Sequence, residues 1–322
     1  MIRTWNTSIA ALKTHKRLIQ ASKAPSLRVI RPLHIRAMET IPGFENVAIT
    51  LPDGLTLEEL WAHPPFKAWV EGLNKSMHLQ SVEAHPFHEN PFHLRSITVQ
   101  AVDRFNGGRI GFLKLSSNIP DSDGEVTLPG STFVRGASVA MLMMLIPDDV
   151  GPDSDERYIV FTVQPRASAT SLSFIEIPAG MMEESGDFKG TAAREIKEEL
   201  GMVVHEDELA CLTDLMGSDA AQLEAAQMGA TQQEALDEHL PEAIFPSPGA
   251  CDEYIKIYSC ERRIPRETLA EWNGKYTGLR EEGELITLKI VPMKDALKVG
   301  RRDAKTVAAL AFWNSLKGEN KV

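Results

Sequence analysis

The sequence predicts an α/β fold in which helices cover a mixed sheet. Strand-like apolar segments precede and follow one central helix, which carries residues 194–199, and an amphipathic helix over 303–316 comes last. The 322 residues, 43% of them hydrophobic, are enough for one large or two modest domains. The longest apolar stretch, at 138–147, is too short to cross a bilayer, so we expect a buried strand there and no membrane partner.

The first region, residues 39–132, is predicted to contain a helix followed by antiparallel strands. Apolar residues at helical spacing cover 55–70, with a pair of prolines inside the pattern. Apolar and polar side chains alternate over 96–103, and a second strand at 109–115 follows a turn rich in glycine. Four histidines between 78 and 93 stand among prolines without the spacing of a metal site, which favours a polar loop.

The second region, residues 133–318, is predicted to form the α/β domain. Ala, Gln and Glu dominate residues 217–243, which we interpret as a helical insertion. The strands of this region show runs or alternation of apolar residues. They are expected at 133–146, 158–163, 174–177, 207–215, 252–261 and 285–291.

The charges are divided unevenly along the chain. Residues 1–38 hold eight of the 34 Lys and Arg residues and none of the 45 acidic ones. Such a leader is typical of an organelle transit peptide, for which we expect a mitochondrial destination, with a plastid or cytoplasmic location, or a plain basic tail, as the alternatives. The acidic remainder argues against nucleic-acid partners. Three cysteines without CxxC spacing indicate a reducing compartment.

One segment carries most of the chemical information. Gly180 opens a loop that leads into a helix with three glutamates, Glu195, Glu198 and Glu199. Residues three and four apart share a helix face, so their carboxylates repel one another unless a cation lies among them. Clustered carboxylate oxygens suit Mg²⁺ or Mn²⁺. A solvated acidic helix face is the alternative interpretation.

The segment 180–202 resembles the Nudix box in its glycines, its Arg-Glu and Glu-Glu pairs and their spacing. One element departs, because the family has a glutamate at position 186, where this chain has Gly186 followed by Asp187. Asp187 is well placed to cap the helix in its stead. The resemblance implies a Nudix-type α/β/α sandwich with a mixed sheet, preceded by a β-rich dimerisation region, and Mg²⁺ as the cofactor, with Mn²⁺ also possible.

The resemblance extends over about 92–316 and is closest to the ADP-sugar and ADP-ribose diphosphatase branch, especially to the ADP-sugar diphosphatases. It implies hydrolysis of ADP-glucose or ADP-ribose to AMP and sugar phosphate, in a homodimer whose residues 92–135 help to form the partner's site. A UDP-sugar diphosphatase and a non-catalytic ADP-ribose sensor are the alternatives, and a protein with a merely acidic surface is a third. The motifs lie at 107–112, 129–130, 134–136, 164–166, 176–180, 245–253 and 277–284.

The resemblance also implies roles for residues of the box. Glu195 and Glu199 are expected to be the main metal ligands, and Glu198 joins them when a further metal binds. The backbone carbonyl of Ala179 is expected to be an additional ligand. Glu198 and Arg194 are also assigned to the catalytic group.

A diphosphate carries negative charge, so its site needs fixed cations beside the metal. Arg166 matches the Gln-x-Arg strand end of the branch and can meet a phosphate with two parallel hydrogen bonds; an ion pair at the surface is its alternative. Arg135 is a second candidate for this contact. Glu176 is expected to hold a substrate ribose or a water molecule, and Glu253 to contact substrate or orient a neighbour.

A glutamate-rich loop supplies the candidate base. In the branch, one glutamate of this loop is the general base, and Glu284 matches best, with Glu281 and Glu282 as alternatives. An ordinary glutamate titrates too low to be a strong base at neutral pH. Its expected task is therefore to position a water that metal ions have made more acidic.

Overall fold

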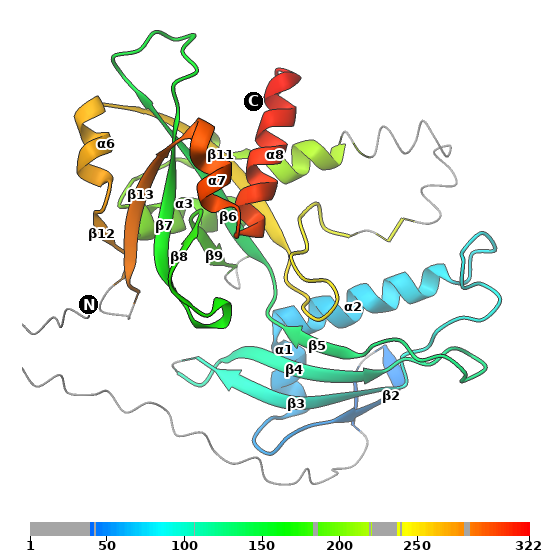
Figure 1. Cartoon of the computed structure of the whole chain (residues 1–322). Helices are drawn as coiled ribbons and strands as arrows, with labels where there is room; N and C mark the ends of the chain where they lie inside the picture. The colour runs from blue at the N-terminus through cyan, green and yellow to red at the C-terminus, as the bar shows by residue number, and fades with distance from the viewer. Residues whose placement is uncertain are drawn as a thin grey trace, which may run out of the picture. The chain divides into compact units, whose positions relative to one another are not determined.

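Two sheets make up the described part of the chain in this computed structural model (Figure 1). The expected leader at 1–38, much of the expected insertion at 217–243, and Glu281 and Glu282 lie outside that part. No helix within it is long and apolar enough to cross a membrane. The structure describes residues 39–41, 43–105, 107–182, 186–218, 220, 237–238, 240–279 and 284–322.

The first sheet has the strand order β1-β2-β3-β4-β5 in the described residues. The helices α1 (Leu57–Ala62) and α2 (Pro64–Leu79) contribute to its core, and Pro64 begins α2 because proline fits the first turn of a helix. The strands that follow these helices, β3, β4 and β5, pair antiparallel. Two further strands precede the helices, and β2 runs parallel to β3. The strands are β1 (Glu39–Ile41), β2 (Phe44–Thr50), β3 (Ser96–Arg104), β4 (Ile110–Asn118) and β5 (Ser131–Val134).

The second sheet has the order β10-β11-β6-β7-β13-β12, with β8 on β7 and β9 on β6, in the part that the structure describes. It is mixed, as predicted, because β11 runs parallel to β6 while its other neighbours pair antiparallel. The strands are β6 (Ser138–Pro147), β7 (Tyr158–Arg166), β8 (Ser171–Glu176), β9 (Ala179–Met181), β10 (Ala210–Cys211), β11 (Ile255–Ile264), β12 (Tyr276–Thr277) and β13 (Ile286–Pro292).

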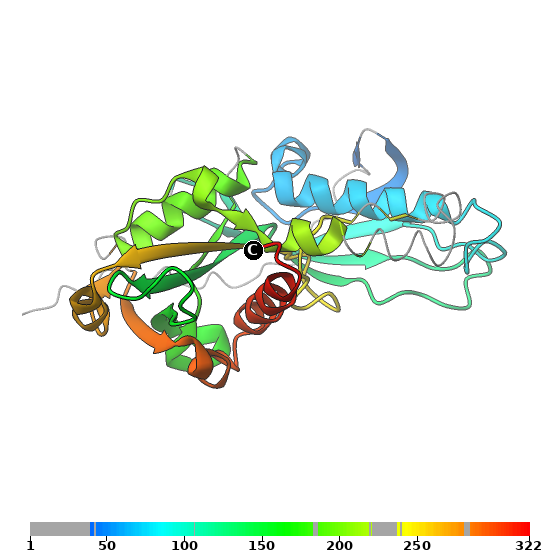
Figure 2. The ribbon, with the colours of Figure 1, turned by 90° about the horizontal axis from the view of Figure 1, so that it is seen from above.

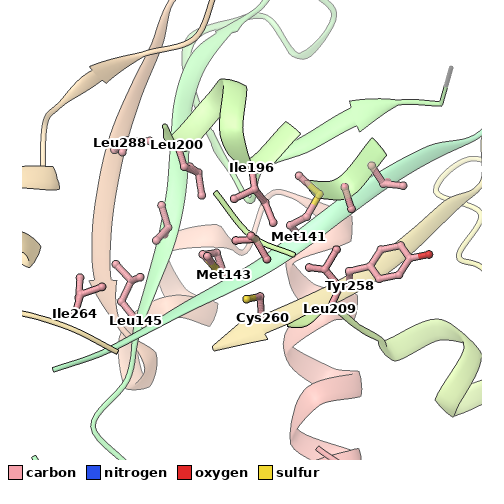
Figure 3. Close-up of a cluster of buried hydrophobic side chains, with 14 of the residues drawn as sticks. Met141, Met143, Leu145, Ile196, Leu200, Leu209, Tyr258, Cys260, Ile264 and Leu288 are labelled. Atoms are coloured by element: carbon pink, nitrogen blue, oxygen red, sulfur yellow. The ribbon is translucent and has the colours of Figure 1, made fainter. Parts of the chain in front are cut away.

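The central strand β6 separates two helix layers. All of its residues are buried, and alternate side chains belong to different cores. Met141 and Met143 pack with residues of α3 (Phe188–Glu195) and η2 (Ile196–Leu200), as Figure 3 shows in part. Leu142 and Met144 pack on the other side with α7 (Met293–Gly300) and α8 (Ala304–Gly318). Figure 2 shows α3 and α8 on opposite sides of this sheet, so the predicted α/β/α sandwich is confirmed. Further short helices are η1 (Ala167–Ala169), η3 (Glu206–Glu208) and α6 (Arg266–Trp272).

Two strand predictions fail. The strand expected at 133–146 is two strands in two sheets, because the chain changes sheet at Gly136, whose φ is +85° and where a Cβ atom would lie 2.7 Å from Pro65. Residues 133–134 therefore complete the first sheet, although the sequence assigned them to the α/β domain. The strand expected at 207–215 shrinks to β10, and residues 212–218 are helical, because Leu212 and Leu215, three positions apart, pack on one core.

Candidate active site

The central helix begins as the sequence predicts and changes its winding part-way. Asp187 caps α3, and its Oδ1 atom accepts a hydrogen bond from the Gly190 amide at 3.0 Å. At Ile196 the α-helix gives way to the π-helical turn η2, which ends at Gly201 with a φ of 71°. A π turn is wider than an α turn. The glutamates therefore do not follow the simple three-and-four spacing on which the sequence prediction relied.

Glu199 is the buried acid of this helix. It is 5% exposed, and its Oε2 atom has no hydrogen-bond partner among the described residues. Burial raises its pKa well above the usual range, and the charges of Glu195, Glu176 and Glu284 raise it further, whereas the charge of Arg166 lowers it. These four side chains share one electrostatic environment with Glu199, in which negative charge is in excess.

Glu195 lies against the loop strand β9. In this strand Ala179 pairs with Ala140 of β6, and Gly180 pairs with Val139. A Cβ atom at Gly180 would lie 1.8 Å from the Oε1 atom of Glu195. Only glycine at position 180 therefore leaves room for this carboxylate beside β9. This strand contains Ala179, whose backbone carbonyl is predicted from the sequence to be a metal ligand.

An ion network lies next to these carboxylates. Arg166 donates from Nε to Glu176 Oε1 at 2.6 Å, and the arginine side chain is 38% exposed while the glutamate is buried. Lys305 donates to the other carboxyl oxygen of Glu176 and, at 2.9 Å, to Asp303 Oδ1. Burial by itself would raise the pKa of Glu176, but the charges of Lys305 and Arg166 outweigh it and lower that pKa.

Arg135 and Glu253 form a second polar group. The Arg135 Nε atom lies 3.0 Å from Glu253 Oε1, an ion pair in which this N–H is not aligned for a hydrogen bond. Ser138 donates from Oγ to the same carboxyl oxygen at 3.0 Å. Asp252 accepts the backbone amide of Arg135 at 2.7 Å, so this arginine is fixed at both its main chain and its side chain.

The remaining predicted catalytic residues have different surroundings. Glu284 is exposed, and its Oε2 atom accepts a hydrogen bond from the Leu279 amide at 3.0 Å. Arg194 donates from Nη2 to Thr191 Oγ1 at 3.3 Å, within its own helix. Glu198 is partly buried. Of these three, Glu284 contributes to the charge that acts on Glu199.

The predicted metal ligands lie near one another, but their side chains are not gathered around one point as in a metal site. Across the described residues, no three His, Cys, Asp or Glu side chains are grouped as a metal site requires. Carboxylates repel one another when no cation lies among them, which favours their separation. The donor set nevertheless fits a hard divalent cation, since it consists of carboxylate oxygens and includes the unpartnered Oε2 atom of Glu199.

The chain is similar to known proteins in part of its sequence. Residues 152–310 match the NUDIX domain. The chain contains a Nudix domain. Over 230 residues it is 34% identical to "Nudix hydrolase 14, chloroplastic" of Arabidopsis thaliana, a stretch that covers 71% of this chain and 65% of that relative. A solved structure described as an ADP compounds hydrolase matches with a TM-score of 0.45 and 17% identity, over 72% of this chain and 97% of that one.

Sequence reasoning missed two residues of this Nudix domain, Asp303 and Lys305. Both stand at the start of α8, in a segment that the sequence marked only as an amphipathic helix. Asp303 caps the helix by accepting the Thr306 amide at 3.2 Å. The sequence contains one indication of this pairing, which is the position of Lys305 in the first turn of a helix. The positive end of the helix dipole disfavours a cation there unless an acid pairs with it.

Replacing Gly180 with Ala should disable the Nudix box while leaving the sheet intact. The added methyl group would occupy the position of the Glu195 carboxylate and displace that side chain. We expect a loss of activity of at least about tenfold, because misplaced groups at an active site are costly. Activity at saturating Mg²⁺ is the measurement, with circular dichroism to confirm folding. Gly151→Ala is the matched control, since nothing lies within 4 Å of a Cβ atom there; equal activity of the two variants would contradict this role of Gly180.

Proposed function

We propose that this chain is a Mg²⁺-dependent hydrolase that cleaves the diphosphate bond of a nucleoside diphosphate sugar, such as ADP-ribose or ADP-glucose. The products are a nucleoside monophosphate and a sugar phosphate. One observation carries this proposal: Glu199 is buried with an unpartnered oxygen, in the same environment as Glu195 and Arg166. Such a combination of acids with a fixed cation suits a metal ion together with an anionic substrate.

The residues that would hold Mg²⁺ are Glu195 and Glu199, joined by Glu198 and by the backbone carbonyl of Ala179. Gly180 makes this possible because it admits the carboxylate of Glu195 against β9. When bound, Mg²⁺ supplies positive charge to the diphosphate and makes a water molecule more acidic.

The chain's own residues bind and orient the reactants. Arg166 binds the diphosphate, and its ion pair with Glu176 holds the guanidinium in place while the side chain keeps an exposed part. Glu284 orients the attacking water and accepts its proton while the water oxygen bonds to one phosphorus. The bond from that phosphorus to the bridging oxygen breaks, and the other phosphate leaves with this oxygen. The hydrogen bond to the Leu279 amide fixes the position of this carboxylate. Arg135 and Glu253 contact the substrate from the junction between the two sheets.

We also propose a homodimer in which residues 92–135 help to form the partner's site. Light scattering during gel filtration tests this assembly. For an organelle leader, the word "chloroplastic" in the name of the plant relative supports the plastid alternative over a mitochondrial destination.

Product analysis tests the function directly. The full chain is incubated with Mg²⁺ and, separately, ADP-ribose, ADP-glucose and UDP-glucose, beside a Glu199→Gln variant. Release of nucleoside monophosphate that is lost in the variant supports the diphosphatase, and the preferred substrate identifies the base. Absence of turnover with all three substrates would overturn the nucleotide-sugar assignment and favour a binding protein that senses such a ligand.

A further inference from the structure

A buried lysine lies outside the Nudix box and next to the proposed diphosphate site. Lys305 is 9% exposed, which is unusual for this residue type unless its charge is paired. Its ammonium group donates to one carboxyl oxygen of Glu176 and to Asp303 Oδ1. Nothing in the proposed reaction uses this lysine directly, so its burial calls for another explanation.

The partners of Lys305 are themselves satisfied. The second oxygen of Asp303, Oδ2, accepts the Thr306 hydroxyl at 2.5 Å and the Ile177 amide at 3.3 Å. The second oxygen of Glu176 accepts the Arg166 guanidinium. The lysine is thus the centre of a continuous network that joins the start of α8 to the end of β7.

This network reaches the proposed site by two routes. Through Glu176 it holds Arg166, which we assign to the diphosphate. Through Asp303 it holds the backbone of Ile177, two residues before Ala179 and the loop strand. Both the cation and the loop that flank the substrate therefore depend on groups that Lys305 bonds.

The charges of the network also balance. Two cations, Arg166 and Lys305, face two carboxylates, Glu176 and Asp303. Without the lysine, one negative charge remains in excess beside a diphosphate that is itself negative. Glu176 would then have only Arg166 as a cationic partner and would compete with the diphosphate for its guanidinium.

We propose that Lys305 is a positioning residue for diphosphate binding, which balances Glu176 so that Arg166 is held in place yet remains available to the substrate. The inference rests on the proposed function. Lys305 is not a catalytic residue, because both of its partners are acids of the network and its side chain is 10% exposed.

The test compares Lys305→Met with Lys305→Arg in the full chain. Binding of the α,β-methylene analogue of ADP-ribose, which cannot be hydrolysed at the central bridge, is measured by calorimetry with Mg²⁺. We expect Lys305→Met to weaken binding by roughly tenfold to hundredfold and to raise KM more than it lowers kcat. Lys305→Arg should recover part of the affinity. Lys317 lies on the same helix as Lys305 and forms an exposed ion pair with Asp155, so Lys317→Met should bind like the wild type.

A double-mutant cycle separates positioning from mere stability. If Lys305 acts through Arg166, the double variant that combines Arg166→Ala with Lys305→Met loses less affinity than the product of the fold-losses in the two single variants. Losses that multiply, or a folded Lys305→Met variant with unchanged affinity, would overturn the inference. If Lys305→Met fails to fold, the double variant Glu176→Gln with Lys305→Met replaces it, because it removes the buried lysine charge together with the charge of Glu176. This double variant should fold and bind the analogue weakly. Wild-type affinity in the double variant would also overturn the inference.

The binding assay keeps this inference distinct from the proposed function. A wild-type chain that binds the analogue but hydrolyses no nucleotide sugar contradicts the function, and the Lys305 variants still decide the role of the network. A wild-type chain that does not bind the analogue contradicts the positioning role itself.

Discussion

Replacing Glu199 with Gln is expected to abolish hydrolysis and, without metal, to make the protein more stable. The carboxylate is buried among other acids and one of its oxygens has no partner, so its charge costs free energy in the folded state. Glutamine has nearly the same shape and no charge. We expect a gain on the order of 1–3 kcal/mol in the free energy of unfolding and a loss of at least about 10²-fold in activity.

The stability difference should depend on pH in a defined direction. Folding raises the pKa of Glu199 above its ordinary value of 4.5, so the folded state holds this proton more tightly than the unfolded state. The wild type therefore loses stability relative to Glu199→Gln as pH rises from 4.5 toward the raised folded pKa, and the two converge at lower pH.

Thermal unfolding without metal, between pH 4.5 and 8, measures this difference. Added Mg²⁺ should raise the melting temperature of the wild type and leave that of Glu199→Gln nearly unchanged. Glu206→Gln, at an exposed position, is the matched control and should behave as the wild type. Equal stability and equal metal response in the wild type and Glu199→Gln would refute the role given to this residue.

Replacing Arg166 with Ala is expected to lower kcat/KM by about 10²-fold to 10³-fold. The loss removes a charge-assisted contact to the diphosphate and also leaves buried Glu176 with one cationic partner fewer. Arg166→Lys keeps the charge but not the planar fork, so its activity should lie between that of the wild type and Arg166→Ala.

Steady-state kinetics with ADP-ribose provide the measurement. Arg266→Ala is a demanding control, because Arg266 makes hydrogen bonds to both Asp149 and Glu156 and yet lies in an exposed ion-pair network outside the site. Its kcat/KM should equal that of the wild type. Should the two alanine variants lose activity to the same extent, Arg166 would have no special role toward the substrate.

Much of the fold could be predicted because its signals are local. The apolar run of β6 predicted a buried strand, and Asp187 predicted the start of the central helix. The change of sheet at Gly136 could not be predicted, because the positive φ of this residue and the close approach of Pro65 both arise from the folded structure. The strand β10 is only two residues long, too short for a periodicity to distinguish it from the helical segment that follows.

The site divides in the same manner. The box glutamates and Arg166 could be located because a short motif carries each of them. The pairing of Lys305 with Glu176 could not be predicted, because the two residues are 129 positions apart and no spacing along the chain relates them. The sequence predicted an ordinary helix where the π turn begins at Ile196.

The place of α8 along the chain has a consequence for synthesis on the ribosome. Translation delivers the acids of the box, and Glu176 before them, well ahead of Asp303 and Lys305, which α8 contributes. A nascent chain therefore carries the acidic face of the sheet before it carries the lysine that balances Glu176. Until α8 docks, that face is the part of the domain where electrostatic repulsion opposes compaction most strongly, so we expect its closure to come late in folding.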